Sequence, residues 1–305
     1  METSGKQLSA MYAVVTGSNK GIGFETVRQL ASHGITVVLT AINEKIGMEA
    51  TSVLHGMGLK NVVFHQLNVV DPVSVESLAE FIRKKFGRLD ILVNNAAITG
   101  AIIDENDLKA LNINATSLGP DEVTKMVQGV IKQTYEKAEE CLNTNFYGVK
   151  RVTEALLPLL QKSSSGARIV NVSSLSGELQ RIRSEHTRNE LGNVETLTEE
   201  KLDAILTRFL QDFKENAIEA NGWSIILPAY GISKAAINAY TRLLARKYPN
   251  MYINCVHPGR VKTDLSWHIG IITAEEGAKG SVKCALLPDG GPSGCYFRQT
   301  EMAEF

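Results

Sequence analysis

The sequence contains no stretch of apolar residues that could cross a membrane as a helix, since about 18 in a row are needed and none occur. Residues 1–10 are polar and carry no apolar run behind a basic start, which an export signal requires. We therefore expect neither membrane insertion nor export. Cysteine is also scarce, because Cys141, Cys255, Cys284 and Cys295 form no CxxC pair and are too few for a disulfide framework. This usage favours a reducing, cytoplasmic location.

An excess of charge of one sign is missing too. The chain has 32 basic and 33 acidic residues, a formal net charge of −1. Binding to a phosphate backbone or an anionic membrane requires a basic surface, so we expect no nucleic-acid or membrane partner. What is present is a globular composition: 44% of 305 residues are apolar, enough for a sizeable core in one large domain or two small ones.

From Tyr12 onward, short β-branched apolar runs alternate with longer segments of helical periodicity. This alternation is typical of βαβ units, in which helices cover both faces of a parallel sheet. The expected strands are 12–16, 36–40, 61–66, 89–93, 168–172, 251–256 and a short one near 294–297. No repeat, linker or low-complexity tract divides the chain. We predict an α/β fold with one doubly wound parallel sheet and a single domain over residues 1–305.

Two segments interrupt the alternation, at about 99–133 and 178–227. Both are far longer than the few residues that usually join a strand to a helix, so we expect helical insertions that form a lid over a substrate. The second should contain a helix from Thr198 to Glu215, with Thr198 as its cap and two glutamates in its first turn.

A glycine-rich segment follows the first expected strand and opens the next helix. It reads Thr-Gly-Ser-Asn-Lys-Gly-Ile-Gly over residues 16–23. Between a strand and a helix, such a segment binds the pyrophosphate of a dinucleotide. Gly17 allows the tight turn, Gly21 a close backbone approach, and Gly23 the packing of helix on strand. The alternative interpretation is an ordinary glycine-rich turn.

The end of the second strand normally contacts the cofactor ribose, through an acid for NAD or a base for the 2′-phosphate of NADP. Here it reads Ala41-Ile42-Asn43, which supplies neither. Lys20 and Lys45 are the nearby cations, although the simpler interpretation of each is a solvated surface lysine. Because a carboxylate that would repel the phosphate is missing, the pattern favours NADP.

Tyr230 and Lys234 lie four residues apart in a segment of helical periodicity, 229–248. Side chains at this spacing project from one face of a helix, so the ammonium should lie beside the phenol. A ketone is a poor hydride acceptor unless its oxygen is protonated or hydrogen-bonded as the hydride arrives. A neighbouring cation would bring the phenol pKa down from about 10. Tyr230 alone would be interpreted as a buried aromatic residue.

With Asn-Asn-Ala-Ala at 94–97 and Tyr-Gly-Ile-Ser-Lys at 230–234, the chain resembles the short-chain dehydrogenase/reductases from about Tyr12 to its end. The segments 64–67, 89–96 and 169–174 bring it closer to a plant branch that includes salutaridine and menthone reductases and is related to the carbonyl reductases. The resemblance implies a Rossmann-type oxidoreductase that transfers a hydride to or from a nicotinamide.

The resemblance also implies individual roles. Lys234 would bind the nicotinamide ribose, Ser174 would hydrogen-bond the substrate carbonyl, and Asn145 would hold a water for a proton relay. Ser174 is chosen because the active serine of the family is the second of its pair, so Ser173 should turn inward or act as a cap. A hydrolase using Ser174 or Ser233 with Lys234 is the alternative, but the chain lacks a nucleophile elbow.

The turn after the sixth strand resembles the one that receives the nicotinamide carboxamide in the family, through the backbone of Val261 and the hydroxyl of Thr263. The full set of expected cofactor contacts is Gly17, Asn19, Lys20, Gly21, Ile22, Gly23, Asn68, Val69, Asn94, Ala96, Tyr230, Lys234, Pro258, Gly259, Val261 and Thr263. His257 precedes this turn and has no His or Cys at metal-ligand spacing, so we interpret it as partly buried and non-catalytic and expect no metal site.

The chain departs from the plant branch at the adenosine end of this set. Ile42 and Ile46 stand where the branch usually places arginines, Asn68 replaces an acid near the adenine, and Ala97 replaces a glycine. Because Lys20 persists, we expect NADP(H) as the cofactor, with NAD(H) as the alternative.

The extra residues before Tyr230 precede the helix through which compact members of the family pair, so we expect a monomer. Trp223 and 225–227 would offer an apolar wall to a hydrophobic carbonyl substrate, unless they pack only among themselves. The expected activity is NADP(H)-dependent reduction of a terpenoid- or alkaloid-like ketone in plant secondary metabolism, or the reverse oxidation. The competing hypothesis is a nucleotide-binding regulatory or scaffold protein with little turnover.

Overall fold

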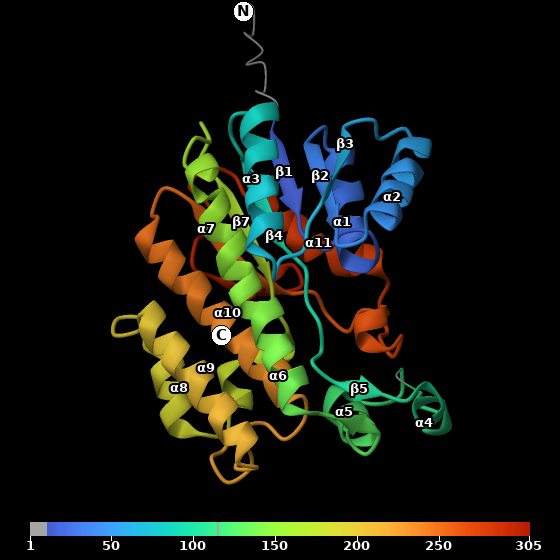
Figure 1. Ribbon diagram of the computed structural model, residues 1–305, viewed down its shortest axis with the longest axis vertical. Coiled ribbons are helices and arrows are strands. Elements are labelled where there is room, and N and C mark those ends of the chain that lie inside the picture. The colour runs from blue at the N-terminus through green and yellow to red at the C-terminus, as the bar shows by residue number, and fades with distance from the viewer. Residues whose placement is uncertain (1–10, 115) are drawn as a thin grey trace, which may run out of the picture.

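A sheet of eight strands forms the centre of the computed structural model, which describes residues 11–114 and 116–305 (Figure 1). Its order is β10-β9-β8-β7-β4-β1-β2-β3. The strands are β1 (Tyr12–Val15), β2 (Thr36–Ala41), β3 (Val62–Gln66), β4 (Ile91–Asn94), β7 (Arg168–Val172), β8 (Tyr252–His257), β9 (Tyr296–Arg298) and β10 (Glu301–Ala303). All neighbours are parallel except β9 and β10. The predicted doubly wound α/β fold is confirmed.

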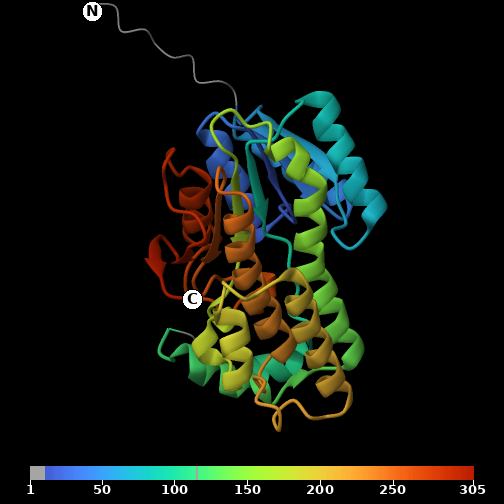
Figure 2. The ribbon, with the colours of Figure 1, turned by 90° about the vertical axis from the view of Figure 1, so that its left-hand side faces the viewer.

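Helices cover both faces of this sheet, because successive strand residues point to opposite sides and both sides are apolar. Ala13 and Val15 pack in one buried cluster with α1 (Gly21–Ser32), α2 (Glu44–Gly56) and α11 (Ala274–Ala285). Val14 packs on the other face, in the larger cluster. That face is covered by α3 (Pro72–Lys85), α7 (Gly148–Leu160) and α10 (Pro228–Lys247), while α6 (Tyr135–Leu142) packs on α10 beyond the end of the sheet (Figures 1 and 2).

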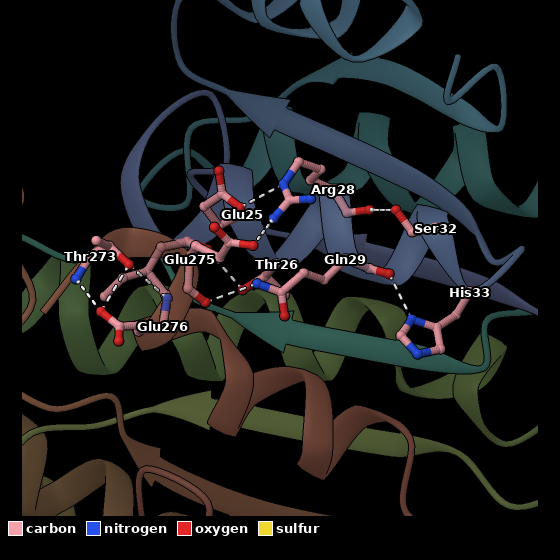
Figure 3. A network of polar contacts seen from close by, with 10 residues as sticks. Glu25, Thr26, Arg28, Gln29, Ser32, His33, Thr273, Glu275 and Glu276 are labelled. Atoms are coloured by element: carbon pink, nitrogen blue, oxygen red, sulfur yellow. Dashed lines mark hydrogen bonds and ion pairs between the residues drawn. The ribbon is translucent and has the colours of Figure 1, made fainter. Parts of the chain in front are cut away.

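The helix that follows the glycine-rich turn is fastened to the last helix of the chain. Figure 3 shows Arg28 of α1 between Glu25 and Glu275, with nitrogen–oxygen distances of 2.7 Å to each carboxylate. Gln29 donates from its side-chain amide to the carbonyl oxygen of Glu275, and Thr273 caps α11 by accepting from the Glu276 N–H. These contacts fix the direction of α1 and therefore the position of its amino end.

Both long insertions lie beyond the same end of the sheet (Figures 1 and 2). The first contains β5 (Ile102–Ile103), α4 (Glu105–Ala110), α5 (Pro120–Gln128) and β6 (Ile131–Lys132), and the second contains α8 (Glu185–Gly192) and α9 (Glu199–Lys214). The helix predicted over Thr198 to Glu215 is confirmed, and the Thr198 hydroxyl accepts from the Lys201 N–H. Within the described ranges, no helix combines the length and apolar character that crossing a bilayer requires.

The sheet reverses its strand order next to β1. The chain runs from β1 outward through β2 to β3, and then returns to the other side of β1 with β4, β7 and β8. In open parallel sheets this reversal leaves a crevice outside the carboxyl ends of the strands, where ligands bind. A ligand site is therefore expected where the loops that follow β1, β7 and β8 lie.

Candidate active site

The turn between β1 and α1 has the geometry of an anion-binding site. Gly17 and Gly21 have φ values of +59° and +57°, in the left-handed region that favours glycine. A Cβ on Gly23 would lie 2.8 Å from the Gly17 carbonyl oxygen, so the helix packs on the turn backbone to backbone. Among the described residues, no side chain caps α1 and no acid stands in its first turn, whereas Asn43 and Asp71 cap α2 and α3. The positive end of α1 is thus left for a ligand such as a pyrophosphate.

Lys20, at the start of α1, contacts the segment after β8. Its ammonium lies 2.5 Å from the carboxylate of Asp264, and both side chains are largely exposed, at 67% and 56%. The hydrogen bond from Lys20 holds the pKa of Asp264 below its usual range. Since the positive charge of Lys20 is paired, this lysine meets a phosphate only in competition with Asp264.

The adenosine end of the expected cofactor site is apolar at its surface. Ile42 and Ile46 are 68% and 47% exposed. Lys45 beside them is also exposed, as the simpler interpretation predicts. Ile42 and Ile46 therefore face outward, where a cofactor phosphate would meet apolar side chains.

Four of the expected cofactor contacts, Asn68, Val69, Asn94 and Ala96, lie at strand ends and make internal contacts. The buried amide of Asn94 donates to side chains of α7 and β7, at 3.0 and 2.8 Å. Val69 is buried, and the Ala96 N–H donates to the hydroxyl of Thr16. The side chain of Asn94 is therefore committed to the core, and only its backbone is left to contact a ligand.

The first turns of α10 bring Tyr230 and Lys234 together, as their spacing predicts. The Lys234 ammonium lies 5.6 Å from the centre of the Tyr230 ring. The same ammonium donates to the carbonyl oxygen of Val172, at 2.8 Å, and the lysine is only 2% exposed. A buried cation is thereby held at the end of β7, directly beneath the phenol.

Burial decides the protonation of this pair. Loss of hydration raises the pKa of Tyr230 to about 12, although the nearby Ser174 hydroxyl acts in the opposite direction. Burial lowers the pKa of Lys234 to about 8. The expected lowering of the phenol pKa by Lys234 is wrong in direction, because desolvation by burial is the largest effect on this group. Tyr230 is consequently protonated at neutral pH.

Ser174 follows β7 and caps a short 3-10 turn, Leu175–Gly177, by accepting a hydrogen bond from the Ser176 N–H at 3.2 Å. Ser173 is buried, and its hydroxyl has no hydrogen-bond partner in the described part of the chain. Ser173 therefore turns inward, one of its two expected placements, while Ser174 provides the cap.

Asn145 lies in a five-residue π-helical segment, Asn143–Tyr147, between α6 and α7. Its amide group donates to the Ile98 carbonyl oxygen at 2.9 Å and to the Ser233 hydroxyl at 3.1 Å. Its side-chain oxygen accepts from the Ile98 N–H, at 2.9 Å. Asn145 is therefore buried behind the residue that precedes Lys234. Interruptions of this type in an α-helix are frequent at functional sites.

A cavity of about 250 Å³ adjoins Tyr230 and Ser174, whereas Lys234 and Asn145 lie behind its wall and do not line it. Tyr230 and Ser174 line it together with five other expected cofactor contacts, Ile22, Pro258, Gly259, Val261 and Thr263. Both insertions add apolar side chains to its wall, namely Val123, Val127, Ile131, Ile226 and Leu227. The expected proton donor thus opens into the same cavity as the turn that resembles a nicotinamide-binding turn.

Comparison with known proteins matches residues 11–185 to the family described as short chain dehydrogenase. The chain belongs to this family. It is 54% identical over 297 residues to short-chain dehydrogenase/reductase 1 of Saponaria officinalis, and the match covers 96% of each chain. The solved structure of salutaridine reductase from Papaver somniferum is 49% identical, with a TM-score of 0.87, covering 94% of this chain and 99% of that one. The solved structure of menthone neomenthol reductase from Mentha piperita is 44% identical, with a TM-score of 0.83, and the match covers 96% of this chain and 100% of that one.

The resemblance inferred from the sequence is confirmed, and this short-chain dehydrogenase is an oxidoreductase. Sequence reasoning missed several residues that line its cavity, among them Arg181, Arg260 and Trp267. His257 is partly buried, as expected, and it also lines the cavity, which the sequence analysis did not foresee. Burial lowers the pKa of His257 to about 4, so its ring is neutral at physiological pH. The available signal was the position of His257 at the carboxyl end of β8, where parallel strands present residues to a ligand.

The apolar wall predicted for the second insertion is only partly correct. Ile226 and Leu227 line the cavity, but Ile225 does not. Trp223 is 3% exposed, and its indole N–H donates to the Asp212 carboxylate at 2.7 Å. The placement of Trp223 at the substrate is therefore wrong, because this ring packs inside the insertion against α9.

Proposed function

We propose that this short-chain dehydrogenase reduces a hydrophobic small-molecule ketone to an alcohol with NADP(H), or catalyses the reverse oxidation. The observation that supports this most strongly is the shared cavity, in which Tyr230 and Ser174 line the same space as Ile22, Val261 and Thr263. A proton donor and a hydride donor must meet the two ends of one carbonyl group.

The residues present fit a dinucleotide. The uncapped amino end of α1 and the glycines of 17–23 suit the pyrophosphate, while Pro258, Gly259, Val261 and Thr263 would hold the nicotinamide. When bound, the nicotinamide supplies or accepts the hydride, which is the part of the chemistry that the protein cannot provide. Asn19 and Ile22 complete the loop around the pyrophosphate, and Lys20 would meet the 2′-phosphate of NADP.

Tyr230 acts as the proton donor. Its raised pKa of about 12 keeps the phenol protonated at neutral pH, which is the state that reduction of a ketone requires. The Ser174 hydroxyl hydrogen-bonds the same carbonyl oxygen and stabilises the charge that develops on it. Lys234 stabilises the phenolate that remains after transfer, since its ammonium lies beneath the ring.

The proton on Tyr230 is replaced through Lys234 and Asn145. Lys234 has a pKa of about 8, close enough to physiological pH to release and regain a proton. Asn145 lies in the π-helical segment, where its amide donates to the hydroxyl of Ser233, the neighbour of Lys234 in the sequence, and it would hold the water that links the lysine to solvent. The buried position of both residues protects this route from bulk water.

The substrate is an apolar ketone of the terpenoid or alkaloid type. Aliphatic side chains from both insertions line the cavity, and the aromatic ring of Trp267 adds to them. Two related proteins are named salutaridine reductase and menthone neomenthol reductase, which supports a carbonyl group on a bulky hydrocarbon frame.

The cofactor is NADP(H). Lys20 provides a cation at the phosphate end, and no described acid follows β2 at positions 41–43 to contact a free ribose as NAD would require. Ile42 and Ile46 make the phosphate pocket weaker than one with arginines, so we expect a modest preference over NAD(H).

Oxidation of reduced nicotinamide, followed by its absorbance with a panel of hydrophobic ketones, tests this function. We expect turnover with NADPH and less with NADH. Tight binding of both cofactors without turnover of any ketone would instead favour the regulatory or scaffold role. A clear preference for NADH would contradict the cofactor assignment while leaving the reductase activity intact.

A further inference from the structure

A buried acid, Glu178, lies at the end of the loop that carries Ser174. Its carboxylate is satisfied by three side chains. One oxygen accepts from the Tyr296 hydroxyl at 2.9 Å and from Arg298 Nε at 2.7 Å. The other accepts from Arg298 Nη2 and from the Gln180 amide, both at 2.8 Å. Although burial alone would raise the pKa of Glu178, these donors hold it below its usual range, so the side chain is ionised.

The anchors of Glu178 come from the far end of the chain. Tyr296 and Arg298 are two residues apart on β9, so both project from one face of that strand. Strand β9 pairs with β8 beside the cavity, and Arg298 is in register with His257. The Tyr296 hydroxyl also lies 3.5 Å from the carbonyl oxygen of Ser174. Strand β9 therefore contacts both ends of the loop 174–178.

The opposite side of the loop is pressed against the catalytic helix. A Cβ on Gly177 would lie 2.6 Å from the carbonyl carbon of Lys234, so the two backbones touch. The side-chain amide of Asn238 donates to the Gly177 carbonyl oxygen at 3.1 Å. The loop therefore lies clamped between α10 and β9. Any shift of the loop moves Ser174 relative to Tyr230.

We infer that Glu178 is a positioning residue for Ser174, anchored by Tyr296 and Arg298, and that it sets the direction of the Ser174 hydroxyl toward the substrate oxygen. The inference rests on the proposed function, in which Ser174 contacts that oxygen. The backbone around Ser174 consists of two short 3-10 turns, Leu175–Gly177 and Leu179–Arg181, which hold a direction weakly by themselves. The bidentate contact between Arg298 and the Glu178 carboxylate restrains the orientation of the loop, which an apolar side chain at position 178 would not do.

A double-mutant cycle distinguishes positioning from general stabilisation. We expect Glu178→Gln to lower kcat for ketone reduction by about 10- to 100-fold, because displacement of a catalytic group by about 1 Å has effects of this size. Cofactor affinity should stay unchanged. In a Ser174→Ala background, the same substitution should lower kcat by about twofold or less, since the group that it positions is already missing.

Substitutions of the residues that anchor Glu178 test the same role if Glu178→Gln folds poorly. Tyr296→Phe removes a single donor and should give a smaller loss of kcat, and Arg298→Lys should retain more activity than Arg298→Met. The matched control is Glu301→Gln, an exposed carboxylate on the adjoining strand β10, which should leave kcat unchanged. Thermal unfolding of each variant reports its folding.

Two results would overturn the positioning role: wild-type kcat in Glu178→Gln, or losses that multiply fully when Glu178→Gln and Ser174→Ala are combined. Full activity of Ser174→Ala alone is a different outcome. It would contradict the role that the proposed function gives to Ser174, and the two failures are therefore separable.

Discussion

Lys234 is the residue whose charge is most easily changed at this site. Burial lowers the pKa of Lys234 to about 8. Burial raises the pKa of the neighbouring Tyr230 to about 12. Below about pH 8 the lysine is charged, and in the proposed reaction it stabilises the phenolate that ketone reduction leaves behind. Above that pH the lysine becomes neutral while Tyr230 is still protonated.

We therefore expect kcat for reduction to be constant below about pH 8 and to fall as pH rises through the lysine pKa. The measurement is kcat at saturating substrates from about pH 6 to about pH 10. Lys247→Gln, at the exposed end of the same helix, should leave the profile unchanged. A profile that is flat to the alkaline limit, or that falls on the acid side, would contradict this role.

Asp264 would compete with the 2′-phosphate of NADP for Lys20, because the two side chains are paired. The two exposed side chains form an ion pair of 2.5 Å, and such pairs contribute about 0 to 1 kcal/mol. Release of the lysine by Asp264→Asn should therefore tighten NADPH binding by up to about fivefold, and should leave NADH binding nearly unchanged. Titration of both cofactors checks this. Asp289→Asn, an exposed carboxylate paired with Arg168, is the matched control. Equal changes for the two cofactors would refute the competition.

At the scale of elements, the sequence predicts those helices and strands that have a local pattern and misses those that depend on distant packing. The central strands were predictable because β-branched apolar runs identify buried parallel strands. Tyr230 and Lys234 could be paired in advance because a helix fixes residues four apart. By contrast, β10 is short and largely exposed, and the ribbon of β5 and β6 has two residues in each strand, so neither leaves a pattern to detect.

The side chains that hold the Ser174 loop could not be predicted either, because their partners are distant in the sequence. Glu178 and Arg298 are 120 positions apart, and no local spacing relates them. For Trp223 a role at the substrate was predicted that the structure does not support. An aromatic residue in an insertion suggested a substrate wall, but the indole N–H of Trp223 donates to the buried carboxylate of Asp212. The pKa direction of Tyr230 was missed because it depends on burial, which composition does not reveal.

The position of α11 against the sheet can be tested at Gly280, where the helix packs closely. A Cβ on Gly280 would overlap the Gln299 carbonyl oxygen and lie 2.8 Å from Val256 Cγ2, whereas one on Gly56 of α2 would meet nothing within 4 Å. Gly280→Ala should lower the free energy of unfolding by about 1 to 3 kcal/mol. Gly56→Ala should raise it by about 0.4 to 1 kcal/mol. Denaturant unfolding measures both, and a stable Gly280→Ala variant would contradict this packing.

At the scale of the whole molecule, the second insertion covers one side of the helices α6 and α10. The apolar face of α9, with Leu202, Ile205 and Phe209 buried, packs on α6 and α10 (Figure 2). We therefore expect a monomer, because that helical surface is already occupied. Light scattering at several concentrations should give the mass of one chain, and a stable dimer or tetramer would refute the prediction.

The central claim is that Tyr230 delivers a proton inside the cavity that also receives the nicotinamide. Tyr230→Phe tests it most directly, because it removes one oxygen from a site whose remaining residues are unchanged. NADPH titration and kcat for a ketone substrate should be measured on the same preparation. We predict near-normal NADPH binding with kcat lower by about 10²- to 10⁴-fold. Retention of wild-type kcat by a variant that still binds NADPH would contradict the role of Tyr230 as the proton donor.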